Sequence, residues 1–137
     1  MELQCTIEVN AAKERIWPYY ADPAKHYIWE EDLEDITLDG ALQTGTTGKM
    51  KLKEMPEMLF TLTEVIEEAS YCDRTDVPGM GSLFFEHRIL RENGKTYIRH
   101  GVRLEKEGFA QGDLEFLSGV FADVPGSMMI IKREAER

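Results

Sequence analysis

Cysteine is scarce in this sequence. Only Cys5 and Cys72 occur among the 137 residues, and their spacing matches no metal-binding motif. We therefore expect two reduced thiols in a cytoplasmic protein. Histidine is almost as rare, with three copies, and no spacing assigns His26 as a third ligand beside the other two. We expect neither a metal nor a cofactor.

Basic residues are outnumbered. The chain has 16 lysines and arginines against 26 acidic residues, a net charge of −10. Nucleic acids and anionic membrane surfaces are bound through basic patches, so we expect neither as a partner. No apolar run approaches the roughly 20 residues of a membrane span, and the opening MELQCTIEVN is not typical of a signal peptide. We therefore expect no membrane span.

Repeats, low-complexity tracts and linkers rich in Pro, Gly or Ser are also missing. Hydrophobic residues make up 42% of the chain and charged residues 31%, as in ordinary globular domains. The length suits one domain with a real core, and we expect residues 1–137 to form it. No Ser/His/Asp arrangement, phosphate-binding loop or nucleotide fingerprint occurs, so the common catalytic motifs do not identify a reaction.

Apolar residues alternate with polar ones through most of the chain, which predicts half-buried strands. We expect these strands at residues 3–9, 33–38, 49–53, 58–68 and 70–76. A helix is expected after Asn10, over residues 11–20, with Pro18 kinking or ending it. Residues in the segment 70–76 alternate between two faces of a strand. One face carries Tyr71, Asp73 and Thr75, and the other carries Arg74 and Asp76. The pattern leaves open which face points inward, and we expect Arg74 to be solvated.

Residues 84–104, FFEHRILRENGKTYIRHGVRL, predict a hairpin. Asn93-Gly94 favours a two-residue turn, because both central residues of a type I′ turn need positive φ. His87 then lies opposite His100, between the pairs Phe85/Val102 and Ile89/Ile98. Directly opposite residues share one face of a sheet. Both histidines are therefore expected on an apolar face.

The last segment, residues 112–137, changes to a helical period. Its apolar stripe predicts one long amphipathic helix, with a kink or break at Pro125-Gly126. The members of the stripe are Leu117, Phe121, Val124, Met128, Ile131 and Ala135. Strands in succession with segregated helices indicate an α+β fold, in which a sheet of six to seven strands curves around the C-terminal helix.

A series of short motifs runs along nearly the whole chain: Asn10-Ala11-Ala12, Ile16-Trp17, Asp22-Pro23, Trp29, Gly45-Thr46, Gly48, Thr63-Glu64-Val65, Glu86-His87-Arg88, Val124-Pro125, Met128, Lys132 and Glu134. In this order and spacing they resemble the SRPBCC superfamily (START/Bet v 1-like), and within it the polyketide cyclase/dehydrase-like proteins. Pro18, directly after the first tryptophan, departs from the pattern and leaves the length of the first helix open.

The resemblance implies a helix-grip fold, in which an antiparallel sheet grips the long helix and leaves a cavity between them. Members bind or transform hydrophobic small molecules such as lipids, sterols, polyketides and plant hormones, and some act on partner proteins. They share no single catalytic constellation, so the fold does not supply a reaction.

His87 and His100 are the candidate site. Three interpretations stay open: packed core histidines, hydrogen bonding to a ligand, and acid–base catalysis. We expect the ligand-binding surface to include the following inward-facing residues: Trp29, Met50, Leu52, Phe60, Leu62, Phe85, His87, His100, Val102, Phe116, Val120, Val124 and Met128.

The favoured function is binding of a hydrophobic small molecule, lipid or polyketide-like, between the sheet and the C-terminal helix. The first alternative is a polyketide cyclase or aromatase that uses both histidines for proton transfer. The second is a protein-interaction module that acts through its acidic surface.

Overall fold

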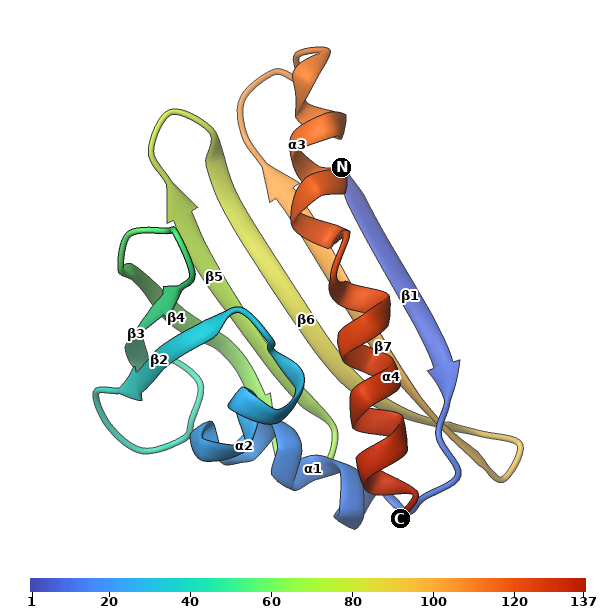
Figure 1. Cartoon of the computed structure of the whole chain (residues 1–137). Helices are drawn as coiled ribbons and strands as arrows, with labels where there is room; N and C mark the ends of the chain where they lie inside the picture. The colour runs from blue at the N-terminus through green and yellow to red at the C-terminus, as the bar shows by residue number, and fades with distance from the viewer.

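A computed structural model describes residues 1–137. Seven strands form one antiparallel sheet in the order β1-β7-β6-β5-β4-β3-β2, and the helices lie on one side of it (Figure 1). The α+β prediction with six to seven strands is confirmed. The strands are β1 (Glu2–Glu8), β2 (Leu33–Leu38), β3 (Thr47–Leu52), β4 (Met58–Ile66), β5 (Ser70–Val77), β6 (Gly81–Glu92) and β7 (Lys95–Glu105).

The hairpin of β6 and β7 has the predicted register. His87 pairs with His100, and the turn residues Asn93 and Gly94 have φ of 52° and 77°. Both angles lie in the left-handed region that this turn requires. On the opposite, outer face of the sheet, the guanidinium of Arg103 lies 4.2 Å from the centre of the Phe84 ring. The histidines therefore share the inner, concave face.

Helix α1 (Lys13–Ala21) contains Pro18 and continues past it, so the helix does not end at that residue, one of the two predicted outcomes. The proline lacks an N–H, yet its own carbonyl accepts from the N–H of Asp22 at 3.0 Å. Burial of Ile16 and Tyr20 holds the last turn against the core and offsets the missing bond.

A second short helix, α2 (Pro23–Trp29), follows at once. Asp22 caps it by accepting from the N–H of Ala24 at 3.0 Å, and Pro23 takes the first helical position, where no N–H is needed. Helices α1 and α2 together cover one end of the concave face (Figure 1).

The C-terminal segment forms two helices, α3 (Gly112–Phe121) and α4 (Val124–Ala135). The predicted break exists, but it lies at residues 122–123, just before Pro125. Pro125 is then in the first turn of α4, where its missing N–H costs nothing. Of the predicted stripe, Phe121 and Val124 next to the break are only half-buried.

By length and composition alone, residues Gly112–Ala135 could cross a membrane. A window of 18 residues within this segment has a mean hydropathy of 1.4, and 17% of that window is buried. The segment is not one uninterrupted helix, because residues 122–123 separate α3 from α4. Met128, Ile131 and Ala135 are nevertheless buried against the sheet, which is also how a core helix behaves.

Two buried clusters form the core. The larger one lies under α1, α2 and α4, and includes Ile16, Tyr20, Trp29 and Met128. The smaller one lies under α3 and consists of Leu83, Val102, Leu104 and Leu117.

Candidate functional site

His87 and His100 lie side by side on the concave face. Their ring centroids are 4.7 Å apart in an edge-to-face arrangement, and the residues are 8% and 3% exposed. Tyr20 from α1 and Trp29 from α2 cover both imidazoles at centroid distances of 5.5 to 5.7 Å. The pair is therefore enclosed by aromatic rings.

Each of these imidazoles has a hydrogen-bond partner within the protein. His100 Nε2 and the Tyr20 hydroxyl share a bond of 2.7 Å, and His87 Nδ1 donates to the Tyr71 carbonyl at 2.7 Å. Burial lowers the pKa of His87 to about 4 despite that bond. Burial, followed by the neighbouring His87, also places the pKa of His100 well below its usual value. Both rings are thus neutral at physiological pH.

His26 lies in the same region, although its spacing in the sequence did not connect it with the other two histidines. Its Nε2 donates to the Tyr20 carbonyl at 2.7 Å, and its Nδ1 lies 3.4 Å from Glu30 Oε2. Burial alone would lower the pKa of His26, but the Glu30 carboxylate and the Tyr20 carbonyl outweigh it and raise that pKa. The signal was present in Asp22-Pro23, which begins a helix and brings residues 26 and 30 to one side of it.

Asp73 is the other residue that the sequence did not select. In β5 the set Tyr71, Asp73 and Thr75 faces inward, while Arg74 is exposed, as expected. Asp73 is 7% exposed, and burial, followed by the charge of Glu30, raises its pKa to about 8. Asp73 therefore carries a proton at neutral pH.

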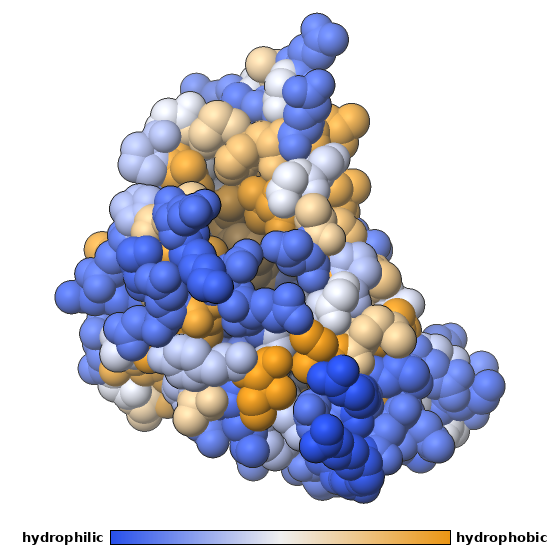
Figure 2. Space-filling view, viewed as in Figure 1, coloured by the Kyte–Doolittle hydropathy of each residue, from blue (hydrophilic) through white to orange (hydrophobic).

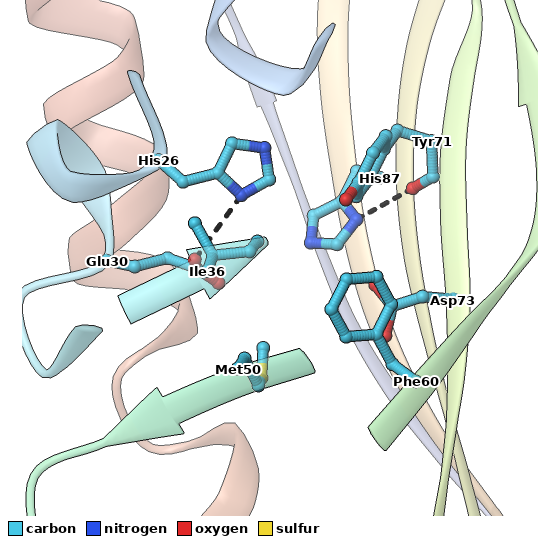
Figure 3. A pocket seen from close by; sticks show the side chains of 8 residues that line it. All are labelled: His26, Glu30, Ile36, Met50, Phe60, Tyr71, Asp73 and His87. Atoms are coloured by element: carbon cyan, nitrogen blue, oxygen red, sulfur yellow. Dashed lines mark hydrogen bonds and ion pairs between the residues drawn. The ribbon is translucent and has the colours of Figure 1, made fainter. Parts of the chain in front are cut away.

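A small pocket lies where α2 faces strands β2 to β6. Figure 3 shows Glu30 and His26 pointing into it from one side, and Asp73 and His87 from the other. Its cavity measures about 10 Å³, room for roughly one water-sized group. The complete lining is His26, Glu30, Ile36, Met50, Phe60, Tyr71, Asp73 and His87.

Gly48 on β3 keeps one wall of this pocket in place. A Cβ atom at this position would lie 2.4 Å from the Phe60 ring and 2.6 Å from the Thr37 carbonyl. The Phe60 ring therefore packs directly on the glycine backbone.

The predicted ligand-binding residues divide into three groups. Met50, Phe60 and His87 line the pocket. Trp29, Leu62, His100 and Met128 are buried in the surrounding core, and Leu52 is half-buried at the end of β3. The remaining five lie in or around the cluster under α3: Phe85, Val102, Phe116, Val120 and Val124.

The cluster under α3 is incompletely covered. Half-buried apolar side chains surround it, among them Val77, Phe85, Phe116 and Val120. Figure 2 shows a hollow bordered by apolar surface between the C-terminal helices and the strands. Phe85 pairs directly with Asp73, so this apolar surface adjoins the polar pocket.

The described residues contain no group of three or more His, Cys, Asp or Glu side chains arranged to hold a metal ion. The polar groups of the pocket can bond a ligand or exchange protons.

No family model and no curated protein matches the sequence. Solved structures do match it. Protein MLL2253 from Mesorhizobium loti superposes with a TM-score of 0.77 at 10% identity, covering 100% of this chain and 98% of that one. Ara h 8.0201 gives 0.76 at 13% identity, over 98% of this chain and 97% of that one.

A third similar structure is DynU16, a putative protein in the dynemicin biosynthetic locus. It gives a TM-score of 0.68 at 13% identity, covering 93% of this chain and 45% of that one. Identities this low establish shape alone. This chain has the same α+β helix-grip fold as these structures, with a curved antiparallel sheet and a long C-terminal helical segment.

Proposed function

We propose that the protein binds a small hydrophobic molecule between the concave face of the sheet and the C-terminal helices. The observation that carries this proposal is the incompletely covered apolar surface around Phe85 and Phe116, which adjoins the polar pocket at Asp73. Ligand sites typically combine an apolar wall with a few placed polar groups. The proposal also agrees with the resemblance of the sequence motifs to the SRPBCC superfamily, whose members bind or transform hydrophobic small molecules.

The enclosed part of the site is small. Drug-sized ligands occupy pockets of roughly 300–1,000 Å³, far above the 10 Å³ next to His87. The body of the ligand therefore belongs in the open hollow under α3, and only a small polar group reaches the pocket. Among the predicted histidines, His87 lines the pocket and His100 does not.

Nile red, an uncharged dye that fluoresces in apolar surroundings, tests the proposal. Phe116→Ser on α3 should weaken dye binding about tenfold. The matched control is Leu114→Ser, because Leu114 is 51% exposed and lies two residues away, roughly 200° around the helix. This control should bind like the wild type. Absence of dye binding by the wild type, or equal weakening by both variants, would contradict the proposal.

Proton transfer to or from the bound molecule is the second candidate. Asp73, with a raised pKa, and His87, with a lowered one, both line the pocket. Environments that separate two pKa values in this way are typical of acid–base pairs. A cyclase-type reaction would then use Asp73 as the acid and His87 as the base, with His100 held by Tyr20.

A further inference from the structure

Three of the polar side chains that line the pocket can offer a hydrogen-bond acceptor to a ligand: Asp73, Glu30 and His87. Asp73 is 93% buried, since its exposed fraction is 7%, and neither a hydrogen bond nor an ion pair within the protein holds its carboxyl group. Buried polar groups normally have partners. An unpartnered carboxyl group that points into a pocket therefore indicates a ligand atom.

Glu30 supplies the second acceptor. Its Oε2 atom is buried and makes no hydrogen bond, although His26 Nδ1 lies 3.4 Å away. Glu30 follows directly after α2 and lies on the side of the pocket opposite Asp73 (Figure 3).

His87 supplies the third acceptor. Because Nδ1 donates to the Tyr71 carbonyl, the neutral ring keeps a lone pair on Nε2. Figure 3 shows this second nitrogen facing the pocket.

We propose that the pocket receives the primary ammonium group of an amphiphilic amine, whose three N–H bonds are accepted by Asp73, Glu30 and His87 Nε2. An ammonium group has three donors and no acceptor, the complement of this lining. It is about the size of a water molecule, which suits a cavity of about 10 Å³. The Phe60 and Tyr71 rings also line the pocket and favour a cation.

This inference rests on the proposed function, because the apolar part of the amine would occupy the hollow under α3. Phe85, the partner of Asp73 in the neighbouring strand, connects the two regions. A straight alkyl chain attached to the ammonium group would pass Phe85 toward Phe116.

Binding of the amine should release a proton. Asp73 is protonated at neutral pH and must ionise to pair with a cation. The groups that surround it are His26 and Glu30 from α2, Tyr71 from its own strand and His87 from β6. His87 is neutral because burial lowers its pKa, and burial raises the pKa of Tyr71, so neither opposes the ammonium charge. Burial of His26 is outweighed by Glu30 and the Tyr20 carbonyl, which raise its pKa, so His26 opposes the ammonium charge while it is protonated. This repulsion decreases as the pH rises, in the same direction as the ionisation of Asp73.

Calorimetric titration with nonylamine and with nonan-1-ol at physiological ionic strength tests the inference. The two probes share one alkyl chain and differ in the head group. An alkyl ammonium group resembles that of lysine and keeps its proton below about pH 10.4. We expect nonylamine to bind at least about tenfold tighter than nonan-1-ol, and this preference to increase from about pH 6 to about pH 8.

Asp73→Asn should abolish the preference for the amine while nonan-1-ol and Nile red still bind. The matched control is Asp76→Asn, which removes the same formal charge from an exposed position of the same strand and should retain the preference. Glu30→Gln is a second variant, at the end of α2, and should also reduce the preference.

Three results would overturn the inference. Equal affinity for both probes would show that the cleft binds hydrophobic molecules without selecting an amine, and the proposed function would stand. Equal loss of the preference in Asp76→Asn would assign it to the net charge of the protein. Absence of binding of nonylamine, nonan-1-ol and Nile red would overturn both proposals.

Discussion

Buried polar residues determine the chemistry of this concave face. Tyr20 has no exposed surface, and its hydroxyl satisfies His100. Asp73 and Glu30 form a second pair, beside the pocket. Glu30 Oε2 is buried without a hydrogen bond, and no hydrogen bond or ion pair within the protein holds the Asp73 carboxyl group. The first pair therefore contributes to stability, and the second pair is available to a ligand.

The variant Tyr20→Phe tests the hydrogen bond between Tyr20 and His100. The substitution keeps the ring and leaves His100 Nε2 buried without its partner, which typically costs about 1–3 kcal/mol. Urea denaturation should show this loss in the free energy of unfolding. A change below about 0.5 kcal/mol would mean that water reaches His100 and replaces the hydroxyl.

Asp73→Asn tests the buried acid through pH. The folded-state pKa of Asp73 is about 8, above the unfolded value near 3.9. Its contribution is therefore fully present below about pH 4, and is lost as the pH rises through about 8. Relative to the variant, the wild type should lose stability over this window, by at most about 1.4 kcal/mol per pH unit.

Urea denaturation of both proteins at intervals between about pH 5 and about pH 8 gives this difference. A difference that is constant across the window would show that Asp73 ionises normally and is hydrated in the folded state. His87 has the opposite sign, because its lowered pKa removes stability as the pH falls from about 6.5 to about 4. Because both proteins contain His87, its contribution cancels in the difference between the wild type and Asp73→Asn.

The elements differ in how firmly they hold the site. Strands β5, β6 and β7 pair along their whole lengths, whereas α3 buries only Asp113 and Leu117. The break at residues 122–123 separates α3 from α4. Helix α3 is therefore the least buried part of the walls around the hollow.

Alanine substitutions measure this difference within α3. Leu117 is fully buried, so Leu117→Ala should cost roughly 2–5 kcal/mol. Phe121 is half-buried beside the break, so Phe121→Ala should cost less than Leu117→Ala, even though phenylalanine is larger. Thermal denaturation of both variants decides the order, and the reverse order would place the core contact of α3 at Phe121.

Gly48 provides the corresponding test for β3. Gly48→Ala forces the new methyl group against the Phe60 ring and the Thr37 backbone, and such overpacking typically costs 1–3 kcal/mol. Gly40→Ala is the control, since its nearest atom would be 3.8 Å away. Chemical denaturation should separate the two variants. Equal stabilities would indicate that β2 and β3 adjust freely.

Local patterns in the sequence predicted the sheet and the hairpin well. Asn93-Gly94 specified the register of β6 and β7, because the turn type and the loop length determine it. The polar pocket was beyond such patterns. Its carboxylates come from α2 and β5, and their proximity depends on how the helix packs on the sheet. The alternation of residues in β5 also gave two faces that the sequence did not distinguish, with Asp73 on one face and Asp76 on the other.

At the scale of the whole molecule, the sheet and the C-terminal helices enclose a full core at one end and an open apolar hollow at the other. The α1 and α2 helices fill the first end with aromatic rings. No helix other than α3 covers the second (Figure 1). This asymmetry is the basis of the proposed ligand site.

The most direct test is an amide chemical-shift map of the ¹⁵N-labelled protein titrated with nonan-1-ol. The account predicts that the largest shifts fall on β5 around Asp73, on β6 around Phe85, and on α3. It predicts small shifts at the Asn93-Gly94 turn, far along the same hairpin. The absence of saturable shifts, or shifts concentrated at that turn, would contradict binding under α3.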